Sequence, residues 1–182
     1  LSGLVGSEMC IRDSNTYSTS SNTAVGHNAM FTNYSGDYNT GVGQGVLYFN
    51  YSGTRNCAFG VRALNYNTTN DNSAFGSYSM TYTTSGDENA SFGSYAMYSN
   101  TIGYQNVGVG KESMYSNTTG GNNVGIGYRA LYTANGYYNV AVGTTAGYAI
   151  TSGASNTLMG DTAGSKINTG AGNSCYGDSA GF

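Results

Sequence analysis

Hydrophobic and polar positions alternate in short stretches that recur along the whole chain. In each stretch bulkier residues flank one small residue, as in Val107-Gly108-Val109 and Val140-Ala141-Val142. A period of two over a short β-branched segment bounded by Gly predicts a strand. Helix is disfavoured because Gly and β-branched residues recur every few positions, and because no stretch shows apolar residues spaced three and four apart.

These strands belong to a tandem repeat. The unit reads N-x-[AG]-[VFI]-G-x-x-A-[LM]-[YF]-x-N-[TY]-[ST]-G-x-x, and its positions are numbered from the opening Asn. Successive units are 16 or 17 residues apart, and they open with Asn22, Asn39, Asn56, Asn72, Asn89, Asn106, Asn123, Asn139, Asn156 and Asn173. Position 5 is always Gly: Gly26, Gly43, Gly60, Gly76, Gly93, Gly110, Gly127, Gly143, Gly160 and Gly177. Repeats of this length are typical of solenoids.

One unit cannot be stable alone. Burying its two large apolar side chains gives about 1.5–3 kcal/mol each, whereas ordering each backbone residue costs about 1–2 kcal/mol. Hydrogen bonds between stacked coils and a continuous core must supply the difference. The sequence therefore predicts an all-β solenoid (a β-roll) of about ten coils over residues 22–182, rising about 4.8 Å per coil. We expect the Asn column to form a hydrogen-bonded ladder, and the Gly column to mark positive φ or close backbone approach.

Two columns carry specific packing expectations. Position 4 is expected to be the most buried column, beside the Met and Leu residues from Met30 to Leu131; its members are Val25, Val42, Phe59, Phe75, Phe92, Val109, Ile126 and Val142. The small residues at position 3 are expected to lie against backbone, from a neighbouring chain if three parallel copies associate; they are Ala24, Gly41, Ala58, Ala74, Ser91, Gly108, Gly125 and Ala141. A monomer is the alternative.

The two ends of the chain depart from the regular repeat. The string from Glu8 to Asp13 resembles the translation of a sequencing adapter, so residues 1–14 are expected to be an artefact and residues 15–21 a lead-in. Residues 139–182 form a variant sub-segment, in which we expect apolar mass to move to another corner of the coil. There Gly147, Gly164 and Gly181 replace Met or Leu, and Ile150 and Ile167 replace the turn Asn. We expect the repeat to continue beyond residue 182.

Composition narrows the function classes. Charged residues make up only 8% of the chain, with a net charge of −3, so phosphate neutralisation and nucleic-acid binding are not expected. No apolar run approaches the roughly 20 residues that cross a bilayer, so membrane insertion is not expected. The one histidine, His27, has no neighbouring carboxylate and nucleophile. We therefore expect no enzyme, no cofactor and no metal site, and interpret Asp161 and Asp178 as a solvated edge in preference to a weak cation site.

Two side-chain columns suggest surface chemistry. The sequons at Asn33, Asn50, Asn67 and Asn117 share one turn column and are candidate glycosylation sites, although the same tripeptides are also good turn sequences. Tyr recurs at position 10 and could stack with sugars or stabilise the stacked coils. The residues are Tyr48, Tyr98, Tyr115, Tyr132 and Tyr148.

The strings NTAVGHNAM and NVGVGKESMYSNTTGGN resemble repeats of bacteriophage tail-fibre-like proteins. The N-x-A-[VI]-G core is also similar to the head repeats of trimeric autotransporter adhesins, whose unit is nearer fourteen residues. The second resemblance implies a left-handed, trimeric β-roll. Together the two resemblances cover residues 22–182.

These resemblances imply a structural or adhesive fibre segment at a virion surface or in the extracellular space. The first hypothesis is the shaft of a viral tail fibre or surface adhesin, with itself as partner in a homotrimer. Host-surface carbohydrate would then be reached through a receptor-binding tip that this sequence does not contain. The alternative is a subunit of a self-assembling, glycosylated filament joined end to end. An ice-binding solenoid ranks third, because regular Thr ranks are missing.

Overall fold

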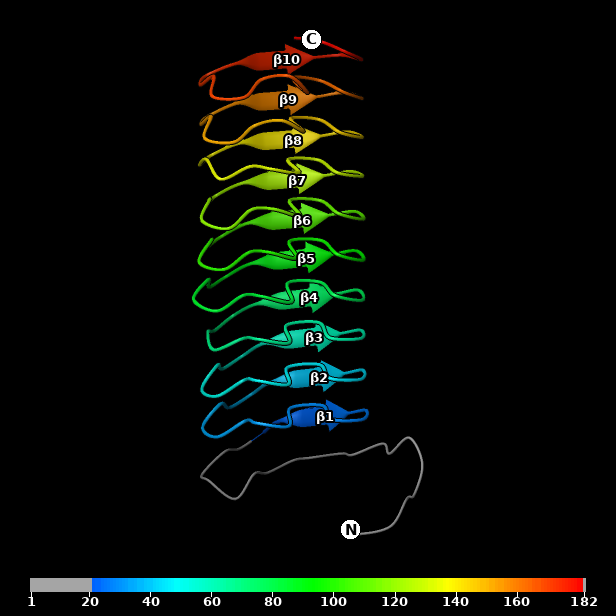
Figure 1. Cartoon of the computed structure of the whole chain (residues 1–182), viewed down its shortest axis with the longest axis vertical. Coiled ribbons are helices and arrows are strands. Elements are labelled where there is room, and N and C mark those ends of the chain that lie inside the picture. The colour runs from blue at the N-terminus through cyan, green and yellow to red at the C-terminus, as the bar shows by residue number, and fades with distance from the viewer. Residues whose placement is uncertain (1–20, 182) are drawn as a thin grey trace.

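The computed structural model describes residues 21–181, so the adapter segment 1–14 and nearly all of the lead-in lie outside the described residues. Ten parallel strands follow one another in a single sheet, in the order of the chain. They are β1 (Thr23–Val25), β2 (Thr40–Val42), β3 (Cys57–Phe59), β4 (Ser73–Phe75), β5 (Ala90–Phe92), β6 (Val107–Val109), β7 (Val124–Ile126), β8 (Val140–Val142), β9 (Thr157–Met159) and β10 (Ser174–Tyr176). The coils stack along the long axis of the molecule as a rod (Figure 1).

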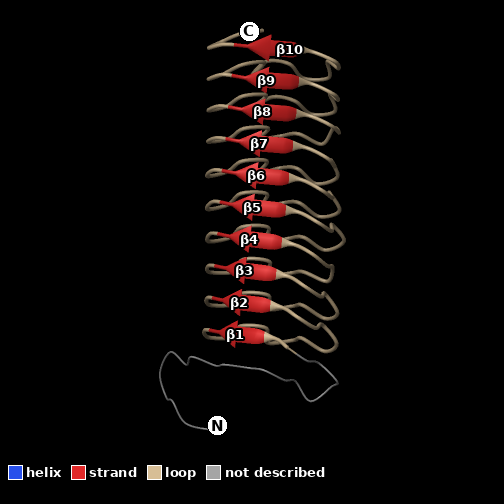
Figure 2. Cartoon of the chain, turned by 180° about the vertical axis from the view of Figure 1, so that it is seen from behind, coloured by secondary structure: helices blue, strands red, loops and turns tan. Residues whose placement is uncertain are grey.

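Each repeat unit makes one coil, so the β-solenoid predicted from the sequence is confirmed. Residues at the same repeat position face each other in neighbouring strands, as Ala24 faces Gly41 between β1 and β2. A unit of 16 residues keeps this register, since Cys57 still pairs with Ser73. Loops and turns connect the strands, and the described residues contain no helix (Figure 2).

The shorter units lose their residue in a turn. In the third coil Thr69 replaces the usual turn Gly, and its carbonyl oxygen accepts the hydrogen bonds that Gly accepts elsewhere, from Asn56 at 2.7 Å and Asn67 at 3.0 Å. The strand and the Asn column therefore stay aligned although the coil is one residue shorter.

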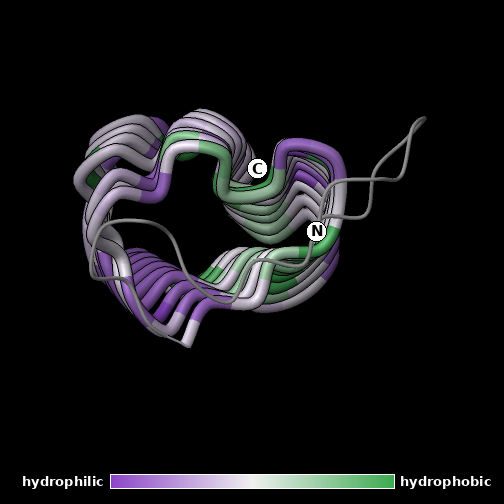
Figure 3. Tube along the Cα trace, turned by 90° about the horizontal axis from the view of Figure 1, so that it is seen from below, coloured by the Kyte–Doolittle hydropathy of each residue, from purple (hydrophilic) through white to green (hydrophobic). Residues whose placement is uncertain are grey.

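The core is a narrow strip that runs the length of the rod. Seen end-on, the coils superimpose, and hydrophobic residues gather in the strand and in the segment that bends toward it (Figure 3). Position 3 of the strand packs against positions 8 and 9 of that segment. The largest fully buried apolar side chains are Met30, Leu47, Leu64, Met80, Met97, Met114, Leu131, Ile150 and Leu158, with Val46 among them.

The expectation that position 4 is the most buried column was wrong, because the strand faces the other way. Phe59 is 36% exposed, whereas Ala58 beside it is fully buried. The residues whose side chains point away from the core are Val25, Val42, Phe59, Phe75, Phe92, Val109, Ile126 and Val142, each at the last position of its strand. Sequence alternation identified two faces of the strand, but the bulkier face lies outside.

The small residues at position 3 pack against the chain's own core and not against a neighbouring chain. A Cβ atom added to Gly108 would lie 2.8 Å from Cγ of Met97, and one added to Gly125 would lie 2.9 Å from Cγ of Met114. The expectation therefore fails for the whole column: Ala24, Gly41, Ala58, Ala74, Ser91, Gly108, Gly125 and Ala141. The coil has room for one large side chain, and Met or Leu at position 9 fills it.

The last coils fill the same space from other positions. Gly147 and Gly164 remove the large side chain at position 9, and Leu158 enters at position 3. A Cβ atom on Gly147 would lie 2.9 Å from Leu158 Cδ1 and 3.2 Å from Ile150 Cδ1, so these two side chains occupy the vacated volume. The large apolar side chains thus come from other positions of the repeat but fill the same core volume, so the expected move to another corner of the coil is not seen, and the sheet continues through β8, β9 and β10.

The position-5 Gly column is required on two grounds. Gly26 has a φ of +132°, a conformation that side chains disfavour, and an added Cβ would lie 2.5 Å from the carbonyl oxygen of Gly43 in the next coil. The equivalent glycines repeat both features up to Gly160. Any side chain at this bend would separate the coils.

The same substitution on the two faces of the sheet tests their assignment. Ala74→Leu adds volume to the filled core, so we expect stability to fall by about 1–3 kcal/mol. Ala90→Leu, in the adjacent coil, points outward and should change stability by less than about 0.5 kcal/mol. Thermal and urea unfolding followed by circular dichroism measure both. Equal losses from the two variants would contradict the assigned faces.

Candidate functional site

The position-1 Asn side chains connect each coil to the previous one and close the coil on itself. Oδ1 of Asn72 accepts hydrogen bonds from the backbone N–H of Asn89 at 3.0 Å and from its Nδ2 at 3.1 Å. Nδ2 of Asn89 also donates to the carbonyl oxygen of Gly103, at the turn of the same coil, at 2.9 Å. This side chain therefore fixes both coil spacing and coil closure.

The same backbone bond recurs from Asn39 to Asn173, where the Asn N–H donates to Oδ1 of the preceding ladder Asn. Most of the ladder is fully buried. No buried side-chain nitrogen or oxygen of the described residues lacks a hydrogen-bond partner. A buried amide whose donors and acceptors are all paired stabilises and aligns a narrow core that few apolar groups could hold.

The turn Asn column is buried as well, so the glycosylation expectation fails for the folded rod. Nδ2, the atom that would carry a glycan, donates to the turn carbonyl oxygen: Asn33 to Gly36 at 2.9 Å and Asn117 to Gly120 at 3.1 Å. The four sequon residues are at most 3% exposed: Asn33, Asn50, Asn67 and Asn117. A glycan has no space there without opening the turn, and the structural interpretation of these tripeptides holds.

Aromatic rings form a continuous series of contacts outside the core, which we call the aromatic spine. The rings are stacked in most pairs and edge-on between Tyr48 and Phe49 and between Tyr82 and Tyr98. Successive ring centroids of the spine are 4.5 to 5.4 Å apart. The members are Phe31, Tyr48, Phe49, Tyr66, Tyr82, Tyr98, Tyr115, Tyr132 and Tyr148. A hydrogen bond with Tyr82, with partial burial and neighbouring Tyr hydroxyls, raises the pKa of Tyr98 to about 12.

The spine includes the predicted Tyr column but does not follow it throughout. Tyr98, Tyr115, Tyr132 and Tyr148 stack directly along position 10. Between Tyr48 and Tyr98 the spine passes instead through Phe49, Tyr66 and Tyr82 at position 11, which the position-10 pattern did not include. Aromatic residues at either of two adjacent positions were the signal that would have identified it.

The outer side of the sheet is a partly exposed, uncharged surface, which we call the outward face. It consists of positions 2 and 4 of the repeat in all ten strands, and none of these residues is charged. Position 4 is apolar or aromatic throughout, whereas position 2 is Ser or Thr in five of the strands. Three rings of the outward face stack, with centroids 5.0 Å apart for Phe59–Phe75 and 4.9 Å for Phe75–Phe92. Ile126 and Met159 extend it and are 38% and 43% exposed.

The few charged residues pair across coils or lie in solvent. Arg55 contacts Asp71 at 2.7 Å, and Arg129 contacts Glu112 at 2.6 Å. The part of the chain that the structure describes contains no group of three or more His, Cys, Asp or Glu placed to hold a metal ion. In residues 21–181 no helix is long and apolar enough to span a membrane. Cys57 and Cys175 are both free thiols.

In comparisons with known proteins, no family model, no curated protein and no solved structure matches this chain.

One ladder position allows an isosteric test with a matched control. In Asn106→Asp the new oxygen faces Asn89 Oδ1 and the Gly120 carbonyl oxygen, both of which now accept from Nδ2 at 3.2 and 2.8 Å. We expect a loss of about 3 kcal/mol or more at neutral pH, because the new oxygen of the buried carboxylate faces two acceptors and has no donor, although the other oxygen keeps the donors of Asn123. Asn122→Asp, outside the ladder, should be nearly neutral.

The Asn106→Asp loss should depend on pH. Burial raises the pKa of the new carboxyl above its unfolded value, so the folded state favours the protonated form. Stability is then highest below the unfolded pKa of about 3.9 and falls as pH rises through it toward the folded value. Urea unfolding at several pH values measures this. A loss that is the same at acidic and neutral pH, or one shared by Asn122→Asp, would count against the buried ladder.

Proposed function

We propose that this chain is a section of a structural fibre shaft, in which three parallel copies bury their outward faces about a common axis. The observation that carries the proposal is the outward face itself: an uncharged strip along the whole sheet, with apolar or aromatic residues throughout position 4. Monomeric proteins rarely expose apolar patches larger than a few hundred Å². Ten coils at about 4.8 Å make a strip about 48 Å long and, at two columns wide, on the order of 500 Å² in projection.

Another copy of the same chain is the partner best suited to this face. Its side chains repeat once per coil, and an identical chain has the same repeat distance, so contacts made at one coil recur at every coil. Specific interfaces bury about 600–1,000 Å² per partner, and the accessible area of the face exceeds its projection because Phe, Ile and Met side chains protrude from it. The face is only two columns wide, and the proposed arrangement places three such faces about one axis.

A shaft also requires stiffness and a uniform cross-section. Every described coil pairs with its neighbours in the same register, and the ladder and the aromatic spine run along the same axis as the sheet. A rod of this kind holds its two ends at a fixed separation. This mechanical role needs no reactive group.

Charge placed on the outward face tests the association. The double variant Val109→Lys/Ile126→Lys should convert the assembly to monomers, since buried ammonium groups would face one another. Thr144→Lys/Asp161→Lys, at exposed positions beside the sheet, should leave the assembly intact. Multi-angle light scattering measures the mass, and small-angle X-ray scattering the length. A wild-type protein that stays monomeric at high concentration would refute the shaft, and a dimer would refute the threefold arrangement.

A further inference from the structure

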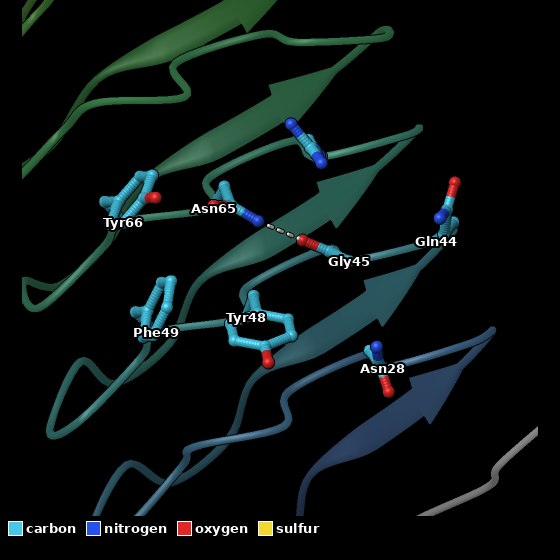
Figure 4. Close-up of a pocket in the computed structure, with 8 residues that line it drawn as sticks. Asn28, Gln44, Gly45, Tyr48, Phe49, Asn65 and Tyr66 are labelled. Atoms are coloured by element: carbon cyan, nitrogen blue, oxygen red, sulfur yellow. Dashed lines mark hydrogen bonds between the residues drawn. The ribbon is translucent and has the colours of Figure 1, made fainter.

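The rod has a hollow where the aromatic spine changes column. It lies across the first three coils and has a volume of about 280 Å³. In Figure 4 the rings of Tyr48, Phe49 and Tyr66 lie to one side, and the amides of Asn28 and Gln44 lie to the other. All of its lining residues follow the strands in their coils, and none belongs to the outward face. It is therefore independent of how copies of the chain associate.

The hollow exists because two positions carry residues smaller than those in other coils. Position 10 of the third coil is Asn65, so no ring continues the column above Tyr48, as Tyr115 and Tyr132 continue it above Tyr98. Asn65 is instead buried, and its Nδ2 donates a hydrogen bond to the carbonyl oxygen of Gly45 at 2.6 Å. Gly45 itself has no side chain to fill the adjacent position. An aromatic surface is left open where other coils place the next ring.

The lining has the chemistry that recognises a sugar ring. The apolar C–H face of a pyranose packs on an aromatic ring, while its hydroxyls need planar donors and acceptors nearby. Asn28 and Gln44 each supply both a donor and an acceptor. The volume is just below the range of about 300–1,000 Å³ that is usual for ligand pockets, so it suits a single ring.

Arg62 contributes a positive charge to the lining of the hollow. Arg55 and Arg129 each form an ion pair with an acidic residue of a neighbouring coil, whereas Arg62 forms no ion pair with any described residue. Arg62 lines the hollow and is exposed. A guanidinium group binds a carboxylate through two parallel hydrogen bonds. We propose that the hollow binds one acidic sugar unit, a pyranose that stacks on Tyr48 and presents its carboxylate to Arg62.

Glucuronic acid and glucose are a matched pair of probes, since they differ only in the carboxylate. We expect the full chain to bind glucuronic acid with a dissociation constant on the order of 1–10 mM, and glucose about tenfold more weakly. Saturation-transfer NMR and titration of backbone amide shifts measure both. Arg62→Gln, at an exposed position, should reduce glucuronic acid binding to the level of glucose without affecting the fold.

Filling the hollow provides the second arm. Asn65→Tyr supplies the ring that position 10 has in other coils, and it should abolish binding of both sugars. Ser165→Tyr adds the same ring to the same column six coils away and should leave binding unchanged; circular dichroism checks that both variants fold. Absence of glucuronic acid binding, or binding that survives Asn65→Tyr, would overturn the site. Equal affinity for the two sugars would overturn the acidic-sugar assignment.

Discussion

The fold depends on a buried asparagine side chain at the start of each coil. Its oxygen accepts the backbone N–H and the side-chain amide of the next ladder Asn, and its own amide donates to the turn carbonyl of its coil, as Asn106 does with Asn123 and Gly120. No other residue of the same size offers both a donor and an acceptor at these distances. One side chain thus sets coil spacing, register and closure, and a chain that repeats it can extend coil by coil.

The narrow core follows from that closure. The hydrogen bonds of the two Asn columns close each coil around a space for one large side chain. Position 9 supplies that side chain in most coils, and Leu158 and Ile150 supply it near the end. The remaining apolar residues of the strand must then point away from the core. The exposed outward face is therefore a consequence of the coil width, and it is the surface through which we propose that copies of the chain associate.

The sequence alone predicted the repeat, one coil per unit, and a strand after each ladder Asn, because these depend on spacing. It did not predict which face of the strand is buried. Alternation distinguishes Ala58 from Phe59 but does not contain the width of the coil, and hydrophobicity alone favoured burying the larger residue. The interpretation of the turn sequons as glycosylation sites failed for a similar reason. The tripeptide at Asn117 does not reveal that its side-chain amide donates a hydrogen bond to the carbonyl oxygen of Gly120. The hollow depends on the missing ring at Asn65, which only the three-dimensional path of the spine makes visible.

Hydrogen exchange of the ladder amides tests the central claim most directly. The backbone N–H of Asn106 donates to the side-chain oxygen of Asn89 at 3.0 Å, whereas the next amide, Val107, donates to the backbone carbonyl oxygen of Asn123 at 2.8 Å. If the ladder holds the coils together, exchange measured by NMR should be slow at both amides and to a similar extent. Exchange at Asn106 and its equivalents as fast as in an unfolded chain, beside protected strand amides, would contradict the ladder as the basis of the fold.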